Sequence, residues 1–177
     1  MVDLCWLGRT FPRRAVILAK KSLQYIPFLG WFMTLADNIF LIRNNKQSIR
    51  DMFKEASNIV LKKQLSVFFF PEGTRGTHEK PDLLPFKKGA FILAVLSQIP
   101  IVPIVVMDMH NVVSNKYHRF PGGKLRVKVL SPIETKGKTE EDVPALMELA
   151  RECMLKTLIE ISPDRVDYTK GAKPKAQ

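Results

Sequence analysis

The sequence predicts an α/β domain, in which helices cover the faces of a sheet. Short apolar segments of strand type alternate along the chain with longer segments of helical period, which is the order that such layered domains show. The length of 177 residues suits one domain, and a hydrophobic content of 46% is enough to bury a core, so general disorder is excluded.

Four elements are predicted in the first third of the chain. Residues 14–20 (RAVILAK) form a short apolar run, which indicates a strand, and residues 39–42 indicate a second strand. Between them, the apolar residues 27–35 predict a short helix. Residues 47–63 predict an amphipathic helix, because apolar side chains recur on one face at helical spacing. These side chains are Ile49, Met52, Phe53, Ala56, Ile59 and Val60.

The middle of the chain predicts a strand, a loop, a helix and a further strand. Residues 65–70 (LSVFFF) indicate a buried strand, which Pro71 ends. A polar loop follows over residues 72–85. Residues 87–98 then indicate a helix, and residues 101–107 indicate a strand.

The last third predicts a half-exposed strand and a long helix. Residues 125–130 alternate apolar and basic side chains after a loop-like segment over residues 110–123. An acidic turn over residues 139–142 opens a helix with one apolar face. That face holds Val143, Met147, Ala150, Met154 and Leu158. We place one domain over residues 1–161 and a loose, polar, basic tail over residues 162–177.

The charge balance predicts an anionic partner. The chain has 28 Lys and Arg against 17 Asp and Glu, a net charge of +11, which suits nucleic acid, a phosphorylated small molecule or an anionic membrane surface. A nucleic-acid module interleaves aromatic with basic residues, whereas the aromatic residues here cluster in apolar runs such as residues 68–70. We therefore expect no nucleic-acid partner.

Two apolar stretches, residues 26–42 and 89–107, approach the length of a membrane span. Both are interrupted, the first by Pro27, Gly30, Asp37 and Asn38, the second by Pro100 and Pro103. We expect no transmembrane helix, and contact of either stretch with one face of a bilayer stays open.

The segment Phe70-Pro71-Glu72-Gly73-Thr74-Arg75 is the most informative part of the sequence. Ligands of open α/β sheets bind beyond the carboxyl ends of strands, where this segment is expected. Gly73 lets a ligand approach the backbone, Thr74 adds a hydroxyl or a backbone donor, and Arg75 offers a planar fork suited to phosphate. The alternative is a plain strand-end turn with a solvated Arg and Glu.

Further cations stand at the ends of other predicted strands. Lys20 and Lys21 end the first strand and Arg43 ends the second, so parallel pairing would bring them to one sheet edge with Arg75. Lys87, at the start of the next helix, is interpreted as a surface lysine. The chain has no P-loop and no G-x-S-x-G motif, and its histidines lack the spacing of zinc ligands, so no metal site is expected.

Several blocks, in the same order and spacing, resemble the glycerolipid acyltransferase family. Residues 70–75 are similar to its F-P-E-G-T-R block, residues 19–23 to A-K-[KR]-x-L, and residues 38–43 to G-x-I-F-[IL]-[DN]-R. Residues 84–91 and 99–104 resemble its later blocks. Within the second block the chain departs from the family, with Asn38 before Ile39 and Ile42 where Asp or Asn is common.

The resemblance covers roughly residues 1 to 161 and implies both a fold and an activity. It implies a mixed sheet with helices on both faces. The implied reaction is acyl transfer from acyl-CoA to lysophosphatidic acid, which gives phosphatidic acid, at the surface of the endoplasmic reticulum membrane. It implies no metal or organic cofactor, because acyl-CoA is a co-substrate.

The family's first block, N-H-x-x-x-x-D, pairs a general base with the carboxylate that orients it. Alignment places Asp3 on the carboxylate of this block, so the histidine would fall before Met1. The resemblance therefore implies a fragment that starts inside the catalytic block, lacks the preceding membrane helices and is inactive as written. The alternative is a short product that binds an anionic lipid or a lipid phosphate without catalysis.

The remaining site residues are also assigned by the resemblance. The residues implied to bind the substrate phosphate are Arg75, Lys20, Arg43, Glu72, Gly73 and Thr74. Arg75 would hold the glycerol phosphate, with Lys20 and Arg43 as auxiliary cations. Glu72 would accept a hydrogen bond from a substrate hydroxyl or hold Arg75 in place.

Overall fold

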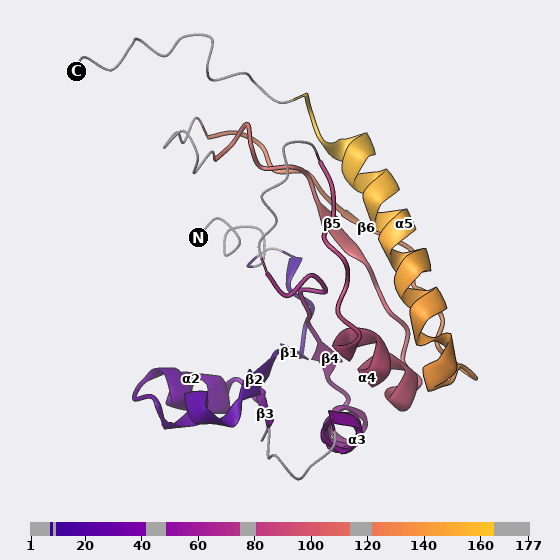
Figure 1. Ribbon diagram of the computed structural model, residues 1–177. Coiled ribbons are helices and arrows are strands. Elements are labelled where there is room, and N and C mark those ends of the chain that lie inside the picture. Colours follow the sequence, from indigo (N-terminus) through magenta and orange to yellow (C-terminus); the bar gives the residue numbers. More distant parts are fainter. Residues whose placement is uncertain (1–7, 9, 42–48, 75–80, 114–121, 165–177) are drawn as a thin grey trace, which may run out of the picture.

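The computed structural model describes residues 8, 10–41, 49–74, 81–113 and 122–164 and has a mixed α/β fold (Figure 1). The strands are β1 (Ala15–Val16), β2 (Leu18–Lys20), β3 (Ile39–Leu41), β4 (Ser66–Val67), β5 (Ile104–Val106) and β6 (Val127–Val129). The helices are α2 (Leu29–Leu35), α3 (Ile49–Lys63), α4 (Gly89–Ser97) and α5 (Val143–Ile161), with short 3-10 helices η1 (Lys21–Tyr25) and η2 (Glu140–Asp142). The predicted alternation of strands and helices is confirmed.

Two of the three strand pairs are parallel. β1 pairs with β4, β2 pairs with β3, and β5 runs antiparallel to β6. The single strand predicted over residues 14–20 is divided at Ile17, whose backbone N–H donates to the side-chain oxygen of Asn38 at 2.9 Å. Because of this break, β1 and β2 pair with different partners.

The prediction of a buried strand over residues 65–70 is wrong in length and in burial. Only Ser66–Val67 is strand, although the N–H of Phe68 still donates to the carbonyl of Val16 at 2.8 Å. Phe70 is 54% exposed, and its ring meets that of Phe68 edge to face with centroids 5.4 Å apart. Phe68 and Phe70 therefore pack ring against ring, and Phe69 packs half-buried against the core formed by Phe53, Ala56 and Leu93.

Helices α3 and α4 pack closely against each other. Phe53 and Ala56 of α3 are buried with Leu93 of α4, and a Cβ added to Gly89 would lie 2.9 Å from the Phe53 ring. Glycine at this position thus allows the close approach of the two helices. Their contact also holds one buried polar pair, in which the hydroxyl groups of Ser57 and Ser97 lie 2.8 Å apart. We call these two residues the serine pair.

Helix α5 covers the β5–β6 pair, along which it runs in Figure 1. Leu158 and Ile161 pack there against Val105 and Met107. The predicted apolar face is confirmed, with Val143, Ala150 and Leu158 buried and Met147 and Met154 half-buried. In the described part of the chain, none of the helices combines the length and the apolar content needed to cross a bilayer.

The serine pair predicts a non-additive mutation cycle. Ser57→Ala or Ser97→Ala alone leaves one buried hydroxyl without its partner and should lower the free energy of unfolding by about 1–3 kcal/mol. The double variant should lose clearly less than the sum, because both polar groups are gone. Urea denaturation of the four proteins measures this, and strictly additive losses would contradict it.

Candidate phosphate-binding turn

The turn that follows β4 is fastened to the segment before α4. The N–H of Gly73 donates to the carbonyl of Phe70 at 3.1 Å and closes the turn. The N–H of Lys87 donates to the carbonyl of Pro71 at 2.7 Å, and the N–H of Leu84 donates to Oε2 of Glu72 at 2.9 Å. These two long-range bonds hold the turn in one position, and one oxygen of the Glu72 carboxylate is used for that purpose.

Gly73 has a backbone φ of +65°, in the left-handed region that favours glycine. The side chain of Lys87 lies over it: a Cβ added to Gly73 would be 2.6 Å from Nζ of Lys87 and 2.7 Å from its Cδ and Cε. The ammonium group of Lys87 therefore stands at the turn. Thr74, the next residue, is exposed there.

Lys87 is the site residue that the sequence reasoning missed. Interpreted from its neighbours alone, it is an exposed lysine at the start of a helix. Its proximity to Gly73 follows from the hydrogen bond between its N–H and Pro71, sixteen positions earlier in the chain. The signal available in the sequence was the pair of adjacent cations Lys87 and Lys88 directly before Gly89.

The structure describes the strand pairing on which the predicted cation cluster depends. β2 and β3 are parallel, and the backbone of Lys20 pairs with Leu41 in the last register position of both strands. The predicted meeting of these two strand ends is thus confirmed. Arg75, Arg43 and Asp3 lie outside the described residues, as does the side chain of Lys20, so the convergence of these side chains stays a prediction.

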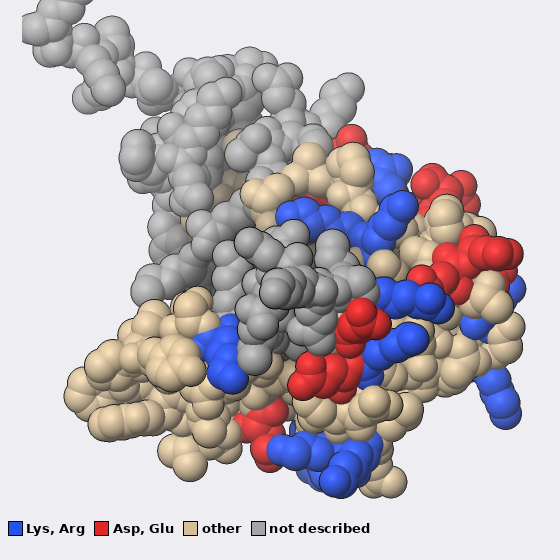
Figure 2. Space-filling view, turned by 60° about the horizontal axis from the view of Figure 1, so that its bottom comes forward, with Lys and Arg blue, Asp and Glu red and all other residues tan. Residues whose placement is uncertain are grey.

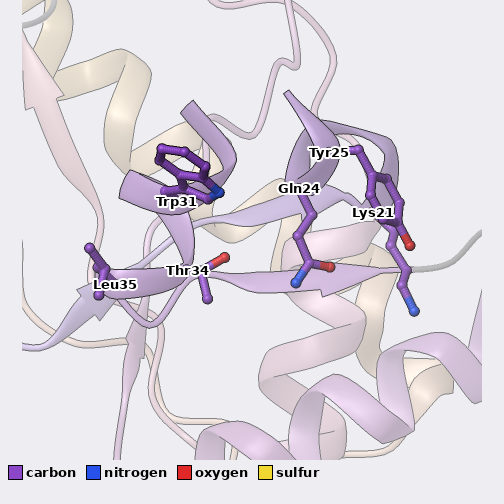
Figure 3. Close-up of a pocket in the computed structure, with 6 residues that line it drawn as sticks. All are labelled: Lys21, Gln24, Tyr25, Trp31, Thr34 and Leu35. Atoms are coloured by element: carbon purple, nitrogen blue, oxygen red, sulfur yellow. The ribbon is translucent and has the colours of Figure 1, made fainter. Parts of the chain in front are cut away.

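An open hollow adjoins the end of β2. It has a volume of about 830 Å³ and lies between η1 and α2 (Figure 3). It is lined by Lys21, Gln24, Tyr25, Trp31, Thr34 and Leu35. Lys21, which lines the hollow, directly follows Lys20, the last residue of β2, so the hollow lies next to the strand end that belongs to the predicted cation cluster. Its lining is mainly apolar, with one cation at its edge.

A family model described as Acyltransferase matches residues 1–107, which include β1 to β5 with the turn and the hollow. The chain belongs to the acyltransferase family. An uncharacterized acyltransferase of Schizosaccharomyces pombe is 41% identical over 97% of this chain and 60% of the relative. The 1-acyl-sn-glycerol-3-phosphate acyltransferase of Saccharomyces cerevisiae is 43% identical over 90% of this chain and 53% of the relative.

The similarity extends to animal proteins and to a solved structure. The human 1-acyl-sn-glycerol-3-phosphate acyltransferase alpha is 39% identical over 92% of this chain and 57% of the relative. The crystal structure of PlsC, a 1-acyl-sn-glycerophosphate acyltransferase from Thermotoga maritima, has a TM-score of 0.62 at 21% identity over 91% of this chain and 62% of that one. The present chain therefore has the same fold as that part of PlsC. The chain spans somewhat more than half the length of these relatives.

The fastened turn predicts different effects for two substitutions of Glu72. Glu72→Ala removes the acceptor of the Leu84 N–H and should lower the free energy of unfolding by about 1 kcal/mol. Glu72→Gln keeps an oxygen acceptor and should retain most of that stability. Urea denaturation measures both, with Glu148→Ala, an exposed carboxylate of α5, as the control. Equal losses for Ala and Gln would show that the hydrogen bond contributes nothing.

Proposed function

We propose that the activity of this protein is acyl transfer from acyl-CoA to the free hydroxyl of 1-acyl-sn-glycerol-3-phosphate, giving phosphatidic acid. The observation that carries the proposal is the similarity to curated enzymes of that name over at least 90% of the chain. The fastened turn at Glu72 and Gly73 supports it, because a rigid glycine turn with a cation above it suits a phosphate group.

In the proposed reaction, the acceptor hydroxyl attacks the carbonyl carbon of the thioester. A carbon–oxygen ester bond forms, the carbon–sulfur bond breaks, and CoA leaves as a thiol with the proton of the hydroxyl. A histidine base takes the proton from the attacking hydroxyl and then gives it to the leaving sulfur, and Asp3 holds the histidine in the correct tautomer and orientation. The chemistry needs no metal or organic cofactor, since the thioester is already activated.

The glycerol phosphate is held by cations around the turn. Arg75 is the main anchor, because a guanidinium donates two hydrogen bonds to one phosphate. Lys20, the last residue of β2, and Arg43, two positions after β3 in the sequence, are auxiliary cations, and Lys87 adds a fourth from beside Gly73. Gly73 and Thr74 shape the turn. The acceptor and the product are membrane lipids, so we place the reaction at a membrane surface, that of the endoplasmic reticulum.

Turnover tests the catalytic part of the proposal. Within the 177 residues, no histidine has an aspartate five positions later: those positions hold Leu83, Asn115 and Gly123. We therefore expect a polypeptide of these 177 residues alone to turn over about 10²–10⁴-fold more slowly than a protein that carries the whole N-H-x-x-x-x-D block, since that factor is the usual contribution of a general base. A thiol-release assay with acyl-CoA and lysophosphatidic acid measures it.

The matched gain of function is an extension, Asn-His-x-x-x, placed directly before Val2. It should restore turnover in lipid-reconstituted protein. Turnover by the unextended chain equal to that of a relative would refute the role given to the histidine. An extended protein that binds lysophosphatidic acid but stays inactive would favour the second candidate function, binding of an anionic lipid or lipid phosphate without catalysis.

Arg75→Ala should weaken the binding of lysophosphatidic acid by roughly ten- to hundredfold, since a charge-assisted contact contributes about 1.5–3 kcal/mol. Arg75→Lys keeps the charge without the fork and should recover only part of the loss. Acyl-CoA binding should change little. Calorimetric titration with a short-chain, water-soluble acceptor measures the dissociation constants without depending on turnover.

Two companion variants interpret that measurement. Lys87→Gln should weaken acceptor binding less than Arg75→Ala does, because an exposed ammonium is a single point charge. Lys128→Gln, on β6, is the control for a general loss of positive charge. If Arg75→Ala leaves acceptor binding unchanged, or weakens both substrates equally, Arg75 is a structural residue of the turn.

A further inference from the structure

The greatest apolar exposure in the described chain is concentrated on one short segment. Of the large hydrophobic side chains there, the five most exposed all lie between residues 25 and 35. They are Leu35 (87%), Phe28 (79%), Tyr25 (75%), Phe32 (68%) and Trp31 (65%). Four aromatic side chains at this exposure present on the order of 500 Å², as much as the largest apolar patch of a typical monomer.

The spacing of these side chains shows that they form one stripe. Trp31, Phe32 and Leu35 lie on α2 at the spacing by which a helix normally covers a core. Phe28, the residue directly before α2, joins them, because its ring meets that of Trp31 edge to face with centroids 5.6 Å apart. Here the stripe faces outward, and α2 buries only Gly30 and Met33 toward the protein. The apolar face of α2, which has the pattern of a face that packs on other residues, is thus exposed.

Local contacts fix this outward orientation. Gly30 packs so closely on the backbone carbonyl of Gln24 that an added Cβ would clash with it. The side-chain amide of Asn38 donates to the carbonyl of Met33 at 3.1 Å, and its oxygen accepts from the N–H of Ile17 at 2.9 Å. The stripe is therefore a built surface, held against η1 and tied back to the strands.

The edge of this surface has the side chains of a membrane interface. Figure 3 shows Tyr25 and Lys21 on η1 across the open hollow from Trp31 and Leu35 on α2. Trp and Tyr favour the headgroup level of a bilayer, where an apolar ring and a polar group are both satisfied. A lysine beside them keeps its charge in water while its stem lies along the apolar surface.

The charge around the stripe suits an anionic surface. The sequence has no acidic residue between positions 8 and 36, whereas five basic residues lie within that range: Arg9, Arg13, Arg14, Lys20 and Lys21. The first carboxylate after it, Asp37, is paired with the ammonium of Lys63, which lowers the pKa of Asp37 by a hydrogen bond and by its charge. Figure 2 shows the resulting lobe, at the left of the view, as a largely tan surface.

We propose that the docking face, formed by Tyr25, Phe28, Trp31, Phe32 and Leu35, binds the surface of an anionic phospholipid bilayer, with Lys21 at the level of the headgroups. The inference rests on the proposed function and deepens it, since it names the part of the protein that meets the membrane. A second copy of the chain is the less favoured occupant, because it would bring two basic flanks together.

Trp31 is a natural reporter of this docking. The chain has two tryptophans, so Trp6→Phe leaves Trp31 as the single emitter. With vesicles of phosphatidylcholine and phosphatidylserine, and without substrates, Trp31 emission should shift to the blue and be quenched by lipids brominated on their acyl chains. Emission unchanged by vesicles would overturn the proposal.

Matched variants separate the docking face from general hydrophobicity. In the same background, Phe32→Ser/Leu35→Ser should lower vesicle partitioning at least about tenfold, because two side chains no longer enter the interface. The control Leu61→Ser/Ile159→Ser removes two apolar side chains that are 50% and 60% exposed on α3 and α5, and should leave partitioning unchanged. Equal losses in both double variants would overturn the proposal.

Two further measurements test the role of the Lys21 charge and the possibility that a second copy of the chain occupies the docking face. Lys21→Gln should weaken binding to the anionic vesicles roughly fivefold and leave binding to pure phosphatidylcholine vesicles unchanged. If sedimentation velocity shows a dimer that Phe32→Ser/Leu35→Ser dissociates while vesicle binding is unaffected, the face is a self-interface and the proposal fails.

The proposed function is judged separately, by titrating the short-chain acceptor without vesicles. Normal acceptor binding with no docking rejects only the docking face, and docking without acceptor binding rejects only the proposed function.

Discussion

Parallel pairing of β2 with β3 is the constraint on which the arrangement of this site depends. Two consecutive parallel strands need a connection that returns to the starting edge of the sheet, and here η1 and α2 supply it. The connection is short, so α2 packs on η1 and has little contact with the sheet. The same constraint brings the ends of β2 and β3 together and leaves the stripe of α2 uncovered.

The turn after β4 is organised by a second, independent set of contacts. Its position is fixed by bonds from the backbone of Leu84 and Lys87, which belong to the approach to α4. Helix α4 is in turn held against α3 by Phe53, by the glycine at its start and by the serine pair. The geometry at Gly73 thus depends on how α4 packs against α3.

The sequence predicted the elements well where periodicity and length decide them. Helices α2, α3, α4 and α5 fall within a few residues of the predicted ranges. In α3 and α5 apolar side chains recur at helical spacing, whereas α2 and α4 are short segments that are mostly apolar. The prediction of a buried strand over residues 65–70 was wrong, because a run of apolar residues shows that the side chains are hydrophobic but does not show that they form a strand. Phe68 and Phe70 pack against each other's rings instead. Lys87 was missed because its place depends on a bond to Pro71, which no local pattern encodes. The role of Arg75 was predicted from a motif and lies outside the described residues.

The absence of a side chain at Gly30 has a mechanical consequence. Because no atom fits between this residue and the carbonyl of Gln24, α2 cannot slide or rise relative to η1 without separating from it. This contact therefore holds the start of α2 against η1. Any flat surface that holds α2 would thereby also hold η1, which directly follows the end of β2.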